Sequence, residues 1–135
     1  MIIALGTDHA GFDLKEVVKK FLEENNYEVK DFGAYEYDSA DDYPDFINPT
    51  AEFVSKNNDA MGIIFGGSGQ GEAMAANRYK GVRAAVFYGG PDKIVSLSRQ
   101  HNNANILSLA ARFIEPEHAI TVSYTHLTLP TILLV

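Results

Sequence analysis

Short, almost continuously apolar runs alternate along this chain with longer segments in which apolar residues recur at helical spacing. The runs at residues 2–5, 61–65 and 106–109 are of the first kind. Residues 13–26 are of the second kind, because apolar side chains recur there every three or four positions with lysines and glutamates between them. Strands that are apolar throughout are buried on both faces, which is typical of a parallel sheet covered by helices. The alternation therefore predicts an α/β fold: a three-layer, doubly wound (Rossmann-like) sandwich with a five-stranded parallel sheet.

Turn residues and prolines set the expected limits of these elements. Asn26 ends the first helix, Gly33 ends the second strand, and Pro44 suits the first turn of another helix. We expect strands at residues 2–5, 27–32, 61–65, 82–87 and 106–109. We expect helices at residues 13–26, from 44, from about 71, at 91–99 and at 115–120.

Composition excludes several classes of function. The 135 residues suffice for one domain with a buried core. The chain has no cysteine, which excludes disulfides, thiolate-bound zinc, iron–sulfur clusters and a cysteine nucleophile. A net charge of −7 argues against a broad nucleic-acid-binding surface, and no apolar run is long enough to span a membrane. Because the first residues also lack the pattern of an export signal, we expect a cytoplasmic protein.

A glycine-rich loop, FGGSGQGEAMAAN at residues 65–77, follows the third expected strand. It is not a dinucleotide-binding fingerprint, since Gly67 and Gly69 fit the first two glycines but Glu72 stands in place of the third. It is not a Walker A loop either, because no lysine lies near. What remains is a run of small residues whose backbone N–H groups can converge on an oxygen at the start of a helix.

Glu72, at the end of this loop, has two explanations on spacing alone. A carboxylate in the first turn of a helix is stabilised by the helix dipole, by about 0.3–1 kcal/mol. A carboxylate beside N–H donors is also suited to removing a proton next to a carbonyl, because the donors stabilise the oxyanion that forms. Both explanations stay open at this point.

Other polar residues follow the expected strands, at the edge where parallel sheets bind ligands. Asp8 and His9 follow the first strand, and Arg112 follows the fifth. His101 precedes two asparagines and the fifth strand, and a histidine there can simply brace a loop. The acidic run at residues 38–45 is expected to be a solvated loop.

Four stretches of the chain together resemble the ribose-5-phosphate isomerase type B family, which also includes galactose-6-phosphate isomerase subunits. They are GTDHAGFDLK, DDYPDF, GGSGQGEAMAANRYKGVRAA and SRQHNNANILSLAAR, and they lie between residue 1 and about residue 120. The resemblance implies an enzyme that interconverts ribose 5-phosphate and ribulose 5-phosphate through an enediolate, on a doubly wound parallel sheet. It implies no metal or other cofactor, and a homodimer or dimer of dimers with its sites between subunits.

The resemblance also assigns roles to single residues. Glu72 is implied to carry the proton between C1 and C2, and the glycine at position 66 places the chain in the branch that uses glutamate instead of cysteine. His101 is implied to open the furanose ring, and Asn102 to bind near the reacting carbons. Asp8 is implied to bind sugar hydroxyls. The remaining substrate-binding residues are His9 and Arg112 for the phosphate, and Gly67, Ser68, Gly69, Gln70 and Gly71 for the oxyanion.

The C-terminal residues depart from the family pattern. Residues 121–135 have no acidic or basic residue apart from a histidine, and they stand where the family has a long helix and phosphate-binding arginines. We therefore expect an isomerase domain at residues 1–120 that is incomplete at its C-terminal end, a helix interrupted near residue 121, and a tail that is not native to the family. Two alternatives to a ribose-5-phosphate isomerase stay open: an isomerase of another aldose 6-phosphate, of galactose or allose type, and a catalytically silent partner subunit that binds sugar phosphates.

Overall fold

Five parallel strands form one sheet at the centre of the molecule. A computed structural model gives the structure of the protein and describes residues 1–128. The strands lie in the order β2-β1-β3-β5-β4, and every neighbouring pair is parallel. They are β1 (Ile2–Thr7), β2 (Glu28–Asp31), β3 (Met61–Gly66), β4 (Ala84–Phe87) and β5 (Ile106–Ala110). The predicted α/β fold with a five-stranded parallel sheet is confirmed, and the strand order reverses between β1 and β3, where such sheets bind ligands.

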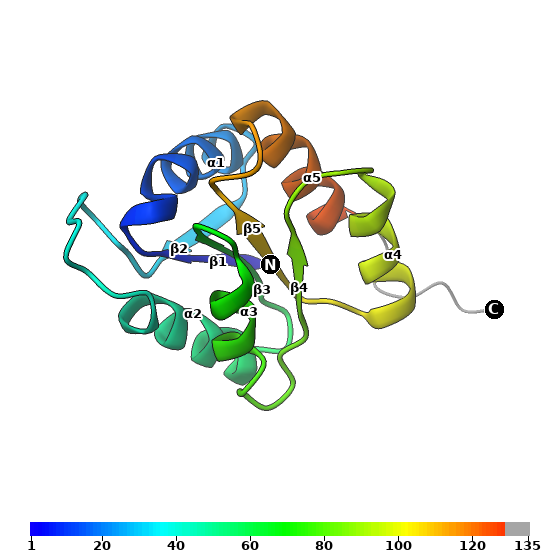
Figure 1. Ribbon diagram of the computed structural model, residues 1–135. Helices are drawn as coiled ribbons and strands as arrows, with labels where there is room; N and C mark the ends of the chain where they lie inside the picture. The colour runs from blue at the N-terminus through cyan, green and yellow to red at the C-terminus, as the bar shows by residue number, and fades with distance from the viewer. Residues whose placement is uncertain (129–135) are drawn as a thin grey trace.

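Helices cover both faces of the sheet, which gives the three layers (Figure 1). One face carries α1, α4 and α5, and the other carries α2 and α3. A short 3-10 helix, η1, precedes α1. The bounds are η1 (His9–Gly11), α1 (Phe12–Glu24), α2 (Pro44–Lys56), α3 (Gln70–Ala76), α4 (Lys93–Asn102) and α5 (Pro116–Thr128).

Alternate residues of each central strand enter two separate cores. In β1, Ile3 and Leu5 pack with α1, α4 and α5, whereas Ala4 packs with α2 and α3. In β3, Ile63 faces the first core and Ile64 the second. Successive side chains of a strand point to opposite faces, so a strand buried on both sides is apolar at most positions. The apolar runs in the sequence therefore predict strands that are buried on both faces.

Helix α4 is longer than the sequence predicted. It continues past residue 99 to Asn102 and ends where Asn103 adopts a left-handed conformation, with φ 51° and ψ 41°. Asparagine tolerates this conformation better than most residues, and it is a common way to end a helix. His101 and Asn102 therefore lie in the last turn of a helix rather than in the loop before β5.

The predicted interruption near residue 121 is wrong, because α5 runs without a break to Thr128. The helix needs no charged residues to form one apolar side, and Ala119, Val122 and Leu127 lie on its buried side. Its threonine hydroxyl groups donate to backbone carbonyls one turn earlier, as Thr121 does to Glu117 and Thr125 to Thr121. That the tail is not native to the family stays a prediction, and residues 129–135, including Pro130, lie outside the described residues. Within residues 1–128, no helix is both long and apolar enough to cross a membrane.

The packing of α5 on α4 buries a histidine completely. His126 has no exposed surface, and Arg99 of α4 donates a hydrogen bond to its backbone carbonyl oxygen. Burial and the nearby Arg99 guanidinium lower the pKa of the His126 ring, the backbone at Gly62 and Asn105 opposes them, and the net result is a pKa of about 3. The ring is therefore neutral in the folded protein at every pH where the protein is commonly studied.

We expect this buried ring to make the protein less stable as the pH falls below 6.5. The folded pKa of His126, about 3, lies below the ordinary value of 6.5, so between these two values the unfolded chain binds a proton that the folded chain does not. The stabilisation is complete above pH 6.5 and is lost by about 1.4 kcal/mol per pH unit on acidification, which is about 2 kcal/mol at pH 5. Urea denaturation at pH 7.5 and pH 5 checks this, with His126→Leu as the comparison. An equal loss of stability in both proteins on acidification would show that the His126 ring is protonated in the folded state.

Candidate active site

The loops after β1, β3 and β5 meet at one edge of the sheet, because these strands are neighbours and run in the same direction. The loop after β3 and the loop after β5 are joined by backbone hydrogen bonds from Ala111 N to Gly66 O (2.8 Å) and from Arg112 N to Gly67 O (3.1 Å). The edge thus collects Asp8, His9, the glycine-rich loop, Glu72 and Arg112, as the sequence predicted.

The glycine-rich loop is fixed to the sheet through its backbone. Gly69 has a φ of +75°, a conformation that side chains other than glycine rarely adopt. The Ser108 hydroxyl, on β5, donates a 2.7 Å hydrogen bond to Gly69 O. The side chains of Ser68 and Gln70 are exposed, so what the loop offers at this edge is mainly its backbone N–H groups. A loop held in this way can bind an oxyanion without first rearranging.

The carboxyl group of Glu72 is folded back over Gly66 instead of pointing into water. A Cβ atom at position 66 would lie 2.1 Å from the carboxyl carbon of Glu72, so the glycine leaves the space that this side chain occupies. Glu72 is 5% exposed, although it stands in the first turn of a helix. Its position therefore depends on a glycine six residues earlier, which helix-dipole stabilisation alone does not require.

The surroundings of Glu72 make it a better proton acceptor than an ordinary carboxylate. Burial raises the pKa of Glu72 and the Asp8 charge adds to this, while the backbone N–H groups of Glu72 and Gly69 and the Arg112 guanidinium oppose it. A base is most effective when its pKa lies nearer to the operating pH, so a raised pKa favours this role.

Two cationic groups lie near the buried carboxylates, Arg112 near Glu72 and His9 near Asp8. The Arg112 guanidinium lies against Gly67, where an added Cβ would be 3.0 Å from Nη1. His9 lies close to both Asp8 and Arg112, since the charges of these residues act on its pKa. Asp8 is buried, and its Oδ1 accepts a 3.0 Å hydrogen bond from the backbone N–H of Ala10, which caps η1. The edge thus presents positive charge next to a pair of buried carboxylates.

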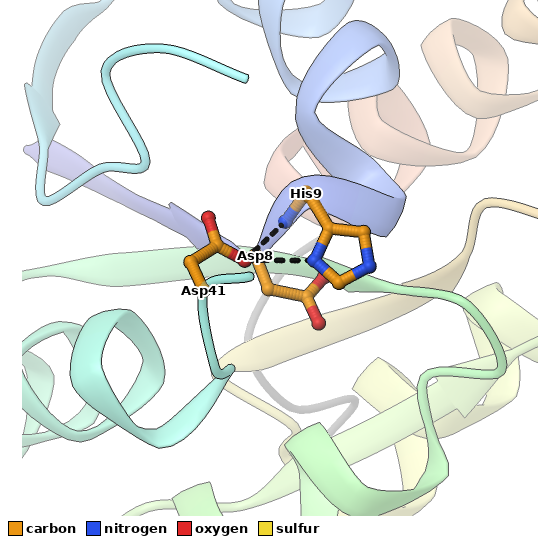
Figure 2. Close-up of side chains that lie close together, drawn as sticks. All are labelled: Asp8, His9 and Asp41. Atoms are coloured by element: carbon orange, nitrogen blue, oxygen red, sulfur yellow. Dashed lines mark hydrogen bonds and ion pairs between the residues drawn. The ribbon is translucent and has the colours of Figure 1, made fainter. Parts of the chain in front are cut away.

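His9 is held by a residue from a distant loop (Figure 2). Asp41 Oδ1 accepts a 2.9 Å hydrogen bond from the backbone N–H of His9 and lies 2.8 Å from its ring Nδ1. The hydrogen bond to Asp41 raises the pKa of His9, the Asp8 charge raises it further, and partial burial and Arg112 oppose the increase. The imidazole is therefore biased towards its cationic form, which suits an anion such as phosphate.

The prediction of a solvated acidic loop at residues 38–45 is wrong for Asp41. Asp38, Asp42 and Asp45 are exposed as expected, but the Asp41 side chain is only 9% exposed and turns towards His9. Nothing local distinguishes Asp41 from its acidic neighbours, and the 32 residues that separate it from His9 put the contact beyond any spacing rule. Only the folded chain identifies it.

Asp8, His9 and Asp41 each offer one possible ligand atom for a cation within 4.8 Å of the others. Two of these groups are already hydrogen-bonded to each other, through His9 Nδ1 and Asp41 Oδ1, and Asp8 accepts from Ala10 N. Hydrogen bonding explains why the three groups lie close together, and we assign the cluster to it. That the reaction needs no metal stays a prediction.

His101 and Asn102 are not brought to this edge within one chain. Helix α4 leads into β5, so its last turn lies at the amino ends of the strands, opposite to the glycine-rich loop (Figure 1). Asn102 there lines a cleft with Asn77 and Arg83, which both precede β4. A single chain therefore separates Glu72 from His101 by the length of the sheet.

Comparison with known proteins agrees with the resemblance seen in the motifs. The Ribose/Galactose Isomerase family matches residues 3–131. The probable ribose-5-phosphate isomerase B of Mycoplasma pneumoniae is 41% identical over 120 residues, which are 89% of this chain and 78% of the relative. The ribose-5-phosphate isomerase B of Mycobacterium tuberculosis is 35% identical over 130 residues, which are 96% of this chain and 79% of the relative.

Solved structures agree with these relatives. Ribose-5-phosphate isomerase B from Mycoplasma genitalium, solved with bound ribulose-5-phosphate, has a TM-score of 0.89 and 39% identity, and the match covers 94% of this chain and 83% of that chain. The ribose 5-phosphate isomerase from Thermotoga maritima also has a TM-score of 0.89, with 42% identity and coverage of 96% and 87%. On its sequence, its fold and the residues gathered at the sheet edge, the chain belongs to the ribose/galactose isomerase family.

Proposed function

We propose that this chain interconverts ribose 5-phosphate and ribulose 5-phosphate, with Glu72 as the base. The enzyme class rests on relatives named ribose-5-phosphate isomerase B, at 35–41% identity over most of the chain, and on the related structure that holds ribulose-5-phosphate. The observation that supports Glu72 is its buried carboxyl group, which lies over Gly66 beside the N–H donors of the loop. An aldose–ketose isomerisation needs one base that reaches two adjacent carbons, and this position suits such a base.

In the forward direction, Glu72 removes the proton from C2 of the open-chain aldose. The electrons of the broken C–H bond form a C1–C2 double bond, and the carbonyl oxygen on C1 becomes the enediolate oxygen. We propose that backbone N–H groups of the loop at residues 67–71 stabilise this negative charge. Glu72 then returns the proton to C1, and the proton of the C2 hydroxyl passes to the enediolate oxygen on C1, so that C2 becomes the ketone and C1 carries a hydroxyl. One carboxyl group serves both carbons, so no net proton is gained or lost.

Binding of the remote phosphate holds the reacting carbons against Glu72. His9 and Arg112 supply positive charge for the phosphate, and Asp8 offers carboxylate oxygens to the sugar hydroxyls. Energy from the phosphate contacts can be used to orient C1 and C2, which raises the rate when the geometry is close to that of reaction.

We propose that a second copy of the chain completes each site with its own His101 and Asn102. These residues lie at the opposite end of the sheet from Glu72, so one chain cannot place all the assigned groups around one sugar. In a two-fold symmetric dimer, whatever one copy contributes to its partner it also receives, so two complete sites form. His101 would move the proton that opens the furanose ring. A dimer of dimers keeps the same arrangement, and a cytoplasmic location stays a prediction.

We expect purified protein to form ribulose 5-phosphate from ribose 5-phosphate at an unchanged rate in excess EDTA. The proposed site stabilises the enediolate with N–H donors and binds the phosphate with cationic side chains, so chelation should remove nothing that the reaction uses. The measurement is ketopentose formation with and without EDTA, with galactose 6-phosphate and allose 6-phosphate as competing substrates. Activity that EDTA abolishes and a divalent cation restores would overturn the mechanism. If the protein converts only galactose 6-phosphate or allose 6-phosphate, the proposed substrate is wrong.

A further inference from the structure

We propose that Asp41 is a positioning residue that holds His9 in the orientation and charge state needed to bind the substrate phosphate. This inference rests on the proposed function, since it assigns a phosphate-binding role to His9. It concerns a residue of the loop between β2 and α2, which contributes none of the groups assigned to the chemistry above.

Within residues 1–128, the hydrogen bonds of the Asp41 side chain all go to His9. Its Oδ1 accepts from the backbone N–H of His9 at 2.9 Å and pairs with ring Nδ1 at 2.8 Å. Its Oδ2 is buried and has no hydrogen-bond partner within residues 1–128. A buried carboxylate that is hydrogen-bonded to one residue only has its charge balanced through that residue. The arrangement therefore favours a protonated imidazole over a neutral one.

The loop between β2 and α2 also contacts the His9 ring through a second side chain. The Tyr37 ring packs edge-on against the His9 ring, with their centroids 6.1 Å apart and an interplanar angle of 83°. With Nδ1 committed to Asp41, the hydrogen on that nitrogen faces the carboxylate, and Nε2 is the nitrogen left for a ligand. Figure 2 shows the second ring nitrogen on the side of the ring away from Asp41.

The other charged groups near His9 act in opposite directions on the charge of its ring. Asp8 favours the cationic ring, whereas Arg112 and partial burial disfavour it. A phosphate bound between His9 and Arg112 needs both cations at once, although the two cations repel each other. Asp41 offsets this repulsion before the substrate arrives, so binding does not have to supply the energy for protonating His9.

The test compares Asp41→Asn with Asp42→Asn. Asparagine keeps the shape and the acceptor oxygen of Asp41 but removes its charge. Asp42→Asn removes the same charge one residue away, from an exposed side chain that, within residues 1–128, accepts a hydrogen bond only from the N–H of Tyr43. The His9 ring signal is followed by NMR between pH 5 and 9, and His9→Gln assigns it by loss of the signal. Inorganic phosphate is the ligand for binding, and ribose 5-phosphate for kinetics.

In Asp41→Asn, the His9 pKa should fall and inorganic phosphate should bind more weakly. KM for ribose 5-phosphate should rise about tenfold at pH 8 and less than about threefold at pH 6, where the solvent protonates the ring without help from Asp41. The value of kcat should change less than about threefold, since His9 is assigned to the phosphate and not to the reacting carbons. Substrate ionisation is the same for both proteins at each pH and cancels in the ratio. Asp42→Asn should match the parent protein in every measurement.

Two results would overturn the proposal. An unchanged His9 titration in Asp41→Asn would show that Asp41 does not control the charge of the ring. A KM increase that is equal at pH 6 and pH 8 would show that Asp41 only shapes the loop. If the parent protein does not isomerise ribose 5-phosphate at all, the proposed function fails instead, and the NMR and inorganic phosphate measurements still decide the role of Asp41.

Discussion

Replacing Glu72 with glutamine should lower kcat for ribose 5-phosphate by about 10³-fold or more and leave KM nearly unchanged. The amide has the size of the carboxyl group and fits the space that Gly66 leaves open, so the substrate should still bind. It cannot accept a proton from carbon, and that transfer takes place only in the transition state. Steady-state kinetics, with circular dichroism to verify the fold, measures the effect.

Glu117→Gln is the matched control, because Glu117 is also a glutamate in the first turn of a helix, α5, but is exposed. This variant removes the helix-dipole stabilisation of a first-turn carboxylate, worth only about 0.3–1 kcal/mol of stability, at a position away from the site. It should therefore leave kcat within about twofold of the parent value. If Glu72→Gln also stays within about tenfold of the parent kcat, Glu72 only stabilises its helix. The base would then have to be sought elsewhere at the sheet edge.

The sequence predicted well those features that depend on neighbouring residues. Nearly continuous apolar runs identified β1, β3 and β5, because most positions of a strand buried on both faces carry apolar side chains. The parallel arrangement then placed the residues after these strands at one edge. This is why Asp8, Glu72 and Arg112 could be grouped before their positions were known.

The sequence predicted poorly those features that depend on tertiary contacts. Asp41 lies among exposed acidic residues, and only the approach of its loop to His9 separates it from them. The charge-free segment after residue 120 predicted an interrupted helix. Instead, contacts with α1 and α4 bury one side of α5 as far as Leu127. The need for a glycine at position 66 could not be predicted from the sequence either, because it depends on the position of the Glu72 carboxyl group in the folded chain.

His101 shows the limit of assigning a site from motifs alone. Its stretch suggested catalysis, yet α4 carries it to the amino ends of the strands, away from Glu72. A motif gives the role of a residue but does not tell in which copy of the chain the role is performed. The symmetry of the assembly therefore has to be tested directly.

Mixing two inactive variants, Glu72→Gln and His101→Asn, should restore activity to roughly a quarter of the parent value when the chains are co-expressed. Random pairing makes about half of the dimers mixed. Each mixed dimer has one site with Glu72 from one chain and His101 from the other, both intact, and one site that lacks both. Each variant alone should retain about 1% or less, since loss of a general acid or base costs about 10²–10⁴-fold. The expected gain on mixing is therefore at least about twentyfold, measured as turnover of ribose 5-phosphate per total chain.

The matched control pairs Glu72→Gln with Arg112→Gln, because Glu72 and Arg112 lie at the same edge of one chain. In their mixed dimer one site lacks the base and the other lacks the guanidinium, so no site is intact and activity should not exceed the average of the two variants. A gain with His101→Asn and none with Arg112→Gln means that the site is shared between copies. If neither mixture gains activity although mass spectrometry detects mixed dimers, His101 does not complete the partner's site, and its position at the far end of the sheet reflects packing alone.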